Sequence, residues 1–423
     1  MERTKMNTLN LIRLCEKEMI ADRRWLHEHA ELSGKETQTI DYIVSRLESL
    51  GLGIYVIPQG GVIGVLNEGK EGPCVLLRAD CDALPVTENP TNLKRPRVCV
   101  SGNPGVMHAC GHDAHMAMLL AAARTLGEMR HELPGSVLFV FERGEEVGGK
   151  GYLENLLPFI EEKFRVNTCY ATHVRWDIPA GKIAIPAGAA MAGAFGFDVT
   201  IEGKGGHGSR PDLAVSPIDC FCAIHQQLQA LRMRAVAPDQ VLTYSLGVVE
   251  AGQQANVIPD SLRFAGTVRT FDTARAGECF AREMKGIIEH TCAAYGCTYT
   301  LSHFSKPLYE VYNHPAAAEF ARRAVVQGVG MGALAACEPW MASESMSAYL
   351  KLWPGVLTFT GVCCAEKGCG ANHHTPEFDV DESAMAYGAA AAVAYAHAFV
   401  TGRPDYDFRR TVVSMEDLVS RSI

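Results

Sequence analysis

Apolar and polar positions along the chain change period in a way that predicts alternating helices and strands. Residues 8–32 and 36–50 carry apolar residues at helical spacing, and glycines follow the second stretch, where a left-handed residue can end a helix. Four short β-rich runs come next, at residues 63–66, 74–78, 136–141 and 168–173. A helix rich in Ala, Met and Leu lies between the second and third of these runs, at residues 113–130. This order, with connections long enough for parallel pairing, predicts an α/β layer fold.

A run of small residues beginning at residue 188, GAAMAGAFG, marks a change of pattern. Beyond it the chain predicts strands at 195–202, 241–249, 261–270 and 298–304, with helices at 216–234 and 275–295. Four strands and two helices indicate a small α+β domain. The first pattern resumes near residue 314, with a helix at 315–328, a strand at 356–361 and a final alanine-rich helix at 381–399.

The prediction is therefore a discontinuous α/β domain with a mostly parallel twisted sheet flanked by helices, interrupted by the small α+β domain. The expected boundaries are residues 1–187 and 305–423 for the two parts of the larger domain, and 188–304 for the insertion. A hydrophobic content of 48% with 21% charged residues suits a globular chain of this length with two or three structural units.

Charge and cysteine usage narrow the class of partner and compartment. A net charge of -9 without a basic stripe argues against a nucleic-acid partner. The first 25 residues mix charged and apolar positions, as an amphipathic helix does and a signal peptide does not, and we expect no membrane-spanning run of 18 apolar residues. Fifteen scattered cysteines are an odd number and predict reduced thiols in a cytoplasmic protein.

Residues able to bind metal follow the predicted strands. Each group stands at or just past the carboxyl end of a strand, where open α/β sheets bind their ligands. The groups are Asp80 and Asp82, Glu145 and Glu146, His173, and His373 and His374. Four separate segments can therefore converge on one crevice.

A fifth group, MHACGHDAH, opens the helix predicted at 113–130 and contains Cys110 and His112. Thiolate and imidazole two residues apart can face one ion and suit Zn, Mn, Co or Ni. A histidine-rich helix start that serves only capping and solvation is the alternative for this segment taken alone.

The adjacent carboxylates Glu145 and Glu146 would repel each other at one site unless cations neutralise them or one points outward. An exposed acidic turn is the structural alternative. In a two-metal hydrolytic site, one carboxylate of such a pair binds metal while its neighbour takes the proton from the activated water and passes it to the leaving amine. The pair therefore favours hydrolysis as the reaction class.

These motifs together resemble a known family. The segments that carry the resemblance are RRWLHEHAELS, LRADCDALPV, NPGVMHACGHDAH, GEEVGG, THVRWDIPAGKI, EGKGGHGSRPDLAVSPID, QQANVIPDSLRFAGTVRTFD and HHTPEFDVDE. In this order they are similar to the bacterial N-acyl-amino-acid amidohydrolases, hippurate hydrolases and plant auxin-conjugate hydrolases of the aminoacylase and carboxypeptidase group of dinuclear metallopeptidases.

The resemblance implies a role for individual residues. The metal ligands would be Cys110, His112, Glu146, His173 and His374, with His373 as the alternative to His374. Glu145 would be the general base, and Asp82 would orient a ligand while Asp80 gives structural support. Two divalent ions are implied, Zn or Mn by preference and Co or Ni otherwise.

The resemblance also implies roles for the inserted domain, as a lid and a homodimer interface. His207, in a glycine turn, would help hold the carbonyl oxygen as it becomes an oxyanion, unless it is an ordinary surface histidine. Asn256 and Arg269 would grip polar groups of the substrate, with structural anchoring as the alternative; an arginine fork suits a carboxylate. One departure is that Ser345 and Met346 stand where relatives carry Asp and Phe.

The sequence thus predicts a metal-dependent amidohydrolase that acts on N-acyl amino acids or similar small amide conjugates. The alternatives are a dipeptidase or aminopeptidase that uses the same site, and a catalytically silent metal-binding scaffold. A silent relative would be expected to have lost the base or a ligand, whereas Glu145 and all five ligand positions are present.

Overall fold

The computed structural model describes residues 7–147, 151–410 and 413–421 of the 423-residue chain. The fold divides into two compact units. Unit 1 comprises residues 1–190, 312–338 and 348–419, and unit 2 comprises residues 191–311, 339–347 and 420–423. The boundaries predicted from the sequence stay a prediction.

Unit 1 is built on an eight-stranded sheet with the order β1-β2-β4-β3-β5-β16-β6-β15. Its strands are β1 (Gly53–Ile57), β2 (Gly61–Leu66), β3 (Cys74–Asp80), β4 (Ser136–Glu142), β5 (Thr168–Pro179), β6 (Ile183–Ala184), β15 (Leu334–Ala335) and β16 (Gly355–Cys363). β3 pairs in parallel with β4 and β5, and β5 pairs in parallel with β16, whereas β1 and β2 form an antiparallel hairpin at the edge. The predicted α/β fold with a mostly parallel sheet is confirmed.

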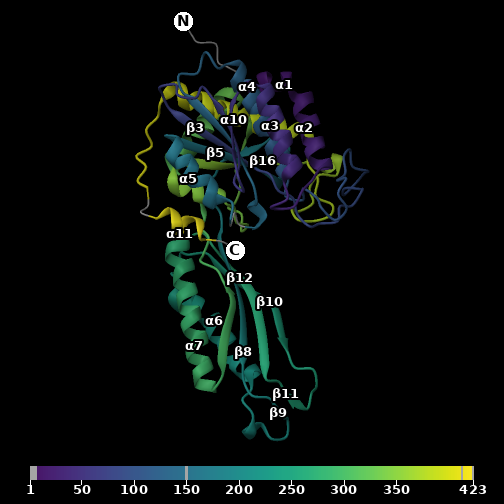
Figure 1. Ribbon diagram of the computed structural model, residues 1–423, viewed down its shortest axis with the longest axis vertical. Helices are drawn as coiled ribbons and strands as arrows, with labels where there is room; N and C mark the ends of the chain where they lie inside the picture. The colour runs from purple at the N-terminus through teal and green to yellow at the C-terminus, as the bar shows by residue number, and fades with distance from the viewer. Residues whose placement is uncertain (1–6, 148–150, 411–412, 422–423) are drawn as a thin grey trace. The chain divides into compact units, whose positions relative to one another are not determined.

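The helices of unit 1 are α1 (Thr8–Leu14), α2 (Glu16–Glu28), α3 (Thr37–Ser49), α4 (His112–Glu128), α5 (Leu153–Lys163), α8 (Pro315–Gly328), α10 (Met385–Gly402) and α11 (Met415–Val419), together with α9 (Met346–Leu352) from Ala348 onward. Figure 1 shows α4 and α10 beside the central strands, and both helices contact β3 and β5. Their alanine-rich faces form one hydrophobic core with the buried residues of these strands.

Two local predictions need correction. The single helix expected at 8–32 is divided at Cys15, whose ψ of 12° departs from helical geometry. His173 does not end its strand, because β5 continues to Pro179 through its parallel pairing with β16. It nevertheless lies past the last residue of β5 that pairs with β3, which is Ala171.

The expectation that no apolar run is long enough to cross a membrane is also corrected. Among the described residues, the stretch Glu382–Gly402 meets that criterion by length and composition. Of its most apolar window, 78% is buried inside the protein, and α10 packs against α1, α4 and α8. Its apolar surface is therefore used in the core of unit 1.

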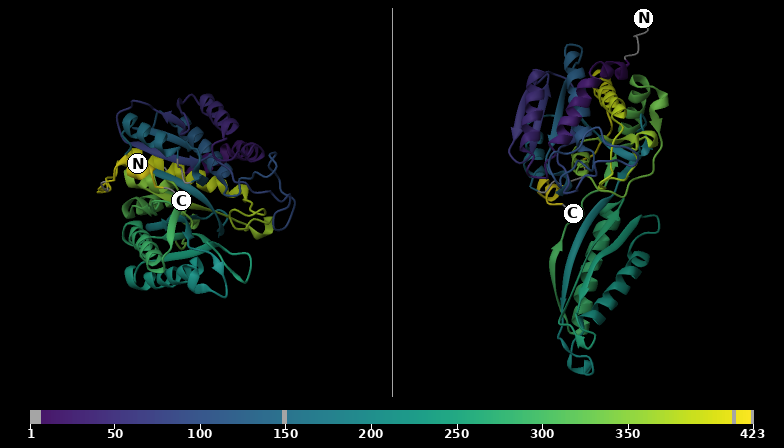
Figure 2. Two further views of the ribbon diagram at one scale, coloured as in Figure 1. Left: turned by 60° about the horizontal axis from the view of Figure 1, so that its bottom comes forward. Right: turned by 90° about the vertical axis from the view of Figure 1, so that its right-hand side faces the viewer.

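Unit 2 contains a four-stranded antiparallel sheet with the order β10-β12-β8-β13. Its elements are β8 (Gly193–Glu202), β9 (Gly206–His207), α6 (Pro217–Ala235), β10 (Leu242–Ala251), β11 (Val257–Ile258), β12 (Ser261–Thr270), α7 (Glu278–Tyr295) and β13 (Thr298–Phe304). Alternate residues of β8, from Phe195 to Ile201, point into a core shared with α6 and α7. Figure 2 shows these helices along one side of the sheet. Short strands β7 (Gly188–Met191) and β14 (Val311–Asn313) pair where the chain passes between the units.

Candidate metal centre

The register of the central sheet brings the acidic groups of unit 1 to one edge. Asp80 ends β3 and pairs with Glu142, which ends β4. Strands β3 and β4 both end at this pair. Asp82 and the short 3-10 turn that contains Glu145 and Glu146 therefore follow at the same carboxyl edge of the sheet. This is the position that the strand pattern predicted for them.

Cys110 and His112 are positioned by a glycine between them. Gly111 caps the start of α4 with a φ of +89°, a conformation that glycine adopts without strain. A Cβ atom here would also collide with Val174. The N–H of His374 donates to the carbonyl of Ala109 at 2.9 Å, which holds the His374 loop against the Cys110 loop. His374 itself has a left-handed φ of +62°.

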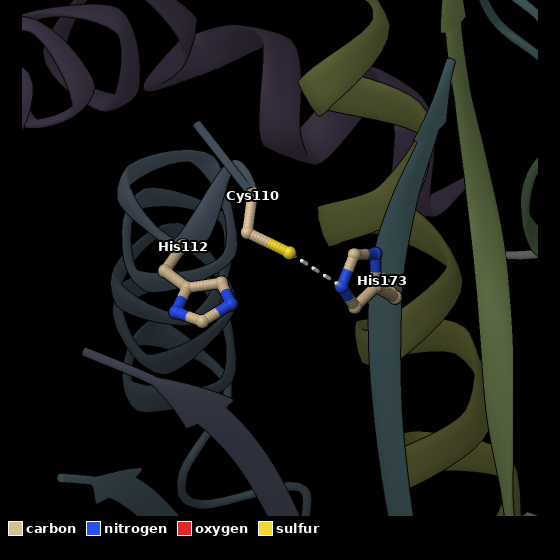
Figure 3. A group of neighbouring side chains, drawn as sticks. All are labelled: Cys110, His112 and His173. Atoms are coloured by element: carbon tan, nitrogen blue, oxygen red, sulfur yellow. Dashed lines mark hydrogen bonds between the residues drawn. The ribbon is translucent and has the colours of Figure 1, made fainter. Parts of the chain in front are cut away.

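Two groups of possible ligands meet at Cys110. In the first, Cys110, His112 and His173 are all buried, and their ligand atoms lie within 4.8 Å of one another. Figure 3 shows the Cys110 thiol between the two rings, with Sγ 3.4 Å from Nε2 of His173. In the second group, Cys110, Glu146 and His374 meet the same 4.8 Å limit. The Nε2 atom of His374 is 3.6 Å from Oε1 of Glu146.

The nearby imidazole of His115 is arranged differently. Its ligand atom lies close to Asp80 and His112, but its two ring nitrogens are already used. Nε2 accepts the N–H of Val174 at 2.8 Å, so Nδ1 carries the proton and donates to Asp80 at 2.6 Å. Neither nitrogen keeps a lone pair for a metal, which makes the Asp80–His115 pair a support for the site.

The unpaired atoms of the site fit divalent cations. Both ring nitrogens of His112, Oε1 of Glu146 and Oδ1 of Asp82 are buried and have no hydrogen-bond partner among the described residues. Burial raises the pKa of Glu146, as do the carboxylates of Asp82 and Asp80. Burial also raises the pKa of the Cys110 thiol. Cations would stabilise the ionised forms of these groups, and sulfur, nitrogen and oxygen donors together suit transition metals.

Asp82 and Glu145 stand beside the ligands. Oδ1 of Asp82 lies 3.3 Å from Nδ1 of His112, on the opposite side of that ring from Nε2. Oδ2 of Asp82 accepts from Ser33 Oγ at 2.6 Å and from the N–H of Glu146 at 2.9 Å. Glu145 is half-buried, and a carboxylate oxygen of it lies within 4.8 Å of ligand atoms of His112 and Glu146.

His373, the alternative to His374, is buried, and its ring stacks at a tilt on Phe378 with a centroid separation of 4.5 Å. Among the described residues, it belongs to none of the close groups of possible ligands, whereas His374 does.

Ser345 and Met346 are buried, and the N–H of Met346 donates to Oε1 of Glu344 at 3.1 Å. The departure from the family pattern therefore falls on a capped start of α9.

The other predicted residues belong to unit 2. His207 lies in β9 opposite Val257, and the N–H of Gly208 donates to the carbonyl of Asn256 at 2.8 Å, so His207 and Asn256 are neighbours. Arg269 lies near the far end of β12 from Ser261. At about 3.3 Å per residue, these two ends are roughly 26 Å apart.

Arg269 is half-buried, and burial lowers its pKa. Among the described residues, no carboxylate lies within ion-pair distance of its guanidinium.

Three residues near the metal-binding groups were not identified from the sequence: Ser33, Glu36 and His115 as a supporting residue. Ser33 ends one of the family-like motifs, but nothing in a linear pattern shows which carboxylate its hydroxyl will meet.

Comparison with known proteins agrees with the family resemblance of the sequence motifs. The model of the peptidase family M20/M25/M40 matches residues 76–398. The N-acetylcysteine deacetylase of Bacillus subtilis is 34% identical over 87% of this chain and 93% of its own length. The IAA-amino acid hydrolase ILR1-like 2 of Arabidopsis thaliana is 33% identical over 88% of this chain and 83% of its own.

Among solved structures, the Bacillus subtilis YXEP protein, described as a dinuclear metal-binding peptidase, superposes with a TM-score of 0.75. It is 29% identical, and the match covers 92% of this chain and 99% of that one.

Proposed function

Because the chain belongs to peptidase family M20/M25/M40, and is thus a metal-dependent hydrolase of amide bonds, we propose that it cleaves small N-acylated amino acids or similar conjugates. The observation that carries this proposal is the pair of ligand groups that share Cys110, with Glu145 beside them. The names of the deacetylase and the IAA-amino acid hydrolase support an acylated amino acid as substrate.

We assign one ion to Cys110, His112 and His173, and the second to Cys110, Glu146 and His374. Zn or Mn is the preferred metal for this mixture of donors, with Co or Ni as alternatives. When bound, such ions lower the pKa of water and polarise the amide carbonyl. We assign Asp82 to the orientation of the His112 ring, because its Oδ1 lies 3.3 Å from Nδ1 of that ring.

Glu145 is proposed as the general base. Its carboxylate takes a proton from the attacking water and gives it to the nitrogen of the leaving amine, so that one group serves both proton transfers.

In unit 2, the guanidinium of Arg269 lacks a carboxylate partner among the described residues and suits the carboxylate of an amino acid. His207 and Asn256 are assigned to the substrate carbonyl as it gains negative charge.

A homodimer is part of this proposal. Asn256 and its neighbour His207 lie outside β12, next to the end that begins at Ser261, and Ser261 is roughly 26 Å from Arg269 along the strand at about 3.3 Å per residue. One copy of unit 2 cannot present both ends to one small substrate. We therefore assign His207 and Asn256 to one copy and Arg269 to the other, with the inserted domain as the dimer interface.

The fifteen free cysteines support a cytoplasmic location.

The test is release of free amine from N-acetyl and N-benzoyl amino acids and from free dipeptides, with protein stripped by chelator and reloaded with Mn or Zn. We expect metal-dependent cleavage of the acylated substrates. Cleavage of dipeptides alone would favour a peptidase, as the description of the YXEP protein allows.

The variant Glu145→Gln should lower kcat by about 10²- to 10⁴-fold with metal content unchanged, because it removes the proton acceptor. Glu154→Gln, an exposed position at the start of α5, is the matched control and should behave as the parent. Parental activity in Glu145→Gln would contradict the mechanism.

A further inference from the structure

The turn that contains Glu145 is held by two carboxylates from other segments. The N–H of Gly144 donates to Oε1 of Glu36 at 3.0 Å, and the N–H of Glu146 donates to Oδ2 of Asp82 at 2.9 Å. The two anchored amides flank Glu145 on either side. The backbone of the proposed base is therefore fixed from both directions.

Glu36 is unusually placed for its surroundings. It is fully buried and occupies the N-cap position of α3, yet its side chain makes no capping hydrogen bond to that helix. Glu31 takes this role instead, since it accepts the N–H of Thr39 at 2.9 Å and that of Gln38 at 3.3 Å. The carboxylate of Glu36 is thus left to contact a different part of the chain.

That contact includes an ion pair with the residue before the turn. Oε2 of Glu36 accepts from both Nε and Nη2 of Arg143, at 3.0 and 2.9 Å, so two charge-assisted hydrogen bonds converge on one carboxylate oxygen. The side chain of Arg143 is only 17% exposed, so solvent screens this pair weakly. One carboxylate therefore fixes both the side chain of residue 143 and the backbone of residue 144.

The two segments approach closely because glycines face each other across a tyrosine. Gly34 has a φ of +82° and Gly144 a φ of +70°, and a Cβ atom on either would collide with the ring or hydroxyl of Tyr152. No other side chain could stand at these two positions without moving Tyr152. The packing leaves the turn little freedom to shift relative to Glu36.

We propose that Glu36 is a positioning residue for catalysis: it sets the place of Glu145 through Gly144 and Arg143, and touches neither substrate nor metal. This rests on the proposed function, in which Glu145 is the base. A displacement of a catalytic group by about 1 Å can cost on the order of 100-fold in rate. Loss of the Glu36 contacts should therefore appear mainly in kcat, because Glu146, the metal ligand on the same turn, keeps its own backbone anchor to Asp82 and the proposed substrate contacts lie on other residues.

The experiment compares Glu36→Gln with the parent as metal-loaded full-length protein on an acylated amino acid. A glutamine cannot accept from both Gly144 and Arg143, since one of its two oxygens is replaced by a donor. We expect kcat to fall about 10- to 100-fold, with KM and metal content within about twofold of the parent. Glu31→Gln is the matched control: it alters the half-buried carboxylate that caps α3, and should lower thermal stability without changing kcat.

A second variant tests the same interaction from its other partner, in case Glu36→Gln folds poorly. Arg143→Gln alters the more exposed partner of the ion pair and should also lower kcat. The double variant should lose little more than the worse single variant, because both changes break one interaction. Fully additive losses would overturn the proposed route through Arg143. A parental kcat in Glu36→Gln, or an equal fall of kcat in Glu31→Gln, would overturn the positioning role.

Glu145→Gln is assayed in the same series to separate the two proposals. If Glu145→Gln keeps its activity, the proposed function fails, whatever Glu36→Gln does. If Glu145→Gln is inactive while Glu36→Gln has parental kcat, only the positioning role fails.

Discussion

At the scale of single residues, buried charge gathers around His27 in α2. Its Nδ1 lies 2.8 Å from Oδ2 of Asp113, the residue after His112, and its Nε2 lies 2.8 Å from Oε1 of Glu88. Arg23 donates to the same oxygen of Asp113 at 2.7 Å. Burial and the Arg23 cation lower the pKa of His27, but the two carboxylates raise it more, so the net shift is upward from 6.5.

A pH dependence of stability follows from this shift. Because the pKa of His27 is higher in the folded state, its contribution is fully present below the unfolded pKa of 6.5 and is lost as pH rises through the folded value. Each unit of pKa difference is worth about 1.4 kcal/mol. Urea unfolding of chelator-treated protein should show a steeper alkaline loss of unfolding free energy for the parent than for His27→Gln. Parallel pH profiles would contradict this.

The residues around the site also differ in how far the sequence could define them. Cys110, His112 and His374 were found because thiols and imidazoles near strand ends are conspicuous in a linear pattern. Glu36 was not, because a glutamate at a helix start usually serves its own helix. Its partner is 107 residues away, and only folding brings Arg143 to it.

At the scale of secondary-structure elements, α10 shows how small residues allow close packing. Its run of alanines, residues 389–392, is buried, and the helix packs against α1, α4 and α8. At Gly388 the approach is closest: a Cβ atom would collide with Sδ of Met118 and lie 2.6 Å from Oγ1 of Thr360.

Gly388→Ala should therefore destabilise the protein by about 1–3 kcal/mol through overpacking, although alanine favours helix by about 1 kcal/mol. The control is Gly402→Ala at the end of the same helix, where nothing lies within 4 Å of the new methyl group. Urea unfolding of both variants measures the difference. Equal stability of the two would show that α10 can shift to accept the methyl group.

Element boundaries were predicted well where the period was strong. The helix at 315–328 and the strands at 261–270 and 298–304 have the predicted limits. β1 and α5 were not predicted. β1 is the outermost strand of its sheet, with only its last residue buried, so its apolar pattern is weak.

At the scale of the whole molecule, the two units have separate hydrophobic cores, one around α4, α10 and the central strands, the other between α6, α7 and β8. All proposed metal ligands lie in unit 1, and all proposed substrate-binding residues lie in unit 2. The proposed homodimer requires that one active site draw on two copies of unit 2.

Mixing two impaired variants tests this arrangement. His207→Ala and Arg269→Ala should each lose most activity alone. In mixed dimers of twofold symmetry, one site carries both substitutions and the other carries neither, so random reassembly should restore about a quarter of parental activity. If both residues served a site from the same copy, every site would keep one substitution and mixing would restore nothing.

The sequence by itself determined the fold class, the edge of the sheet where chemistry gathers, and the types of ligand present there. These follow from local period and from the order of strands, which a linear pattern contains. Only the tertiary structure decided which atoms meet: that His115 has no lone pair left for metal, and that Glu36 holds the turn of Glu145. Hydrogen-bond and ion-pair partners depend on distances between segments far apart in the chain, and those distances exist only once the core has packed.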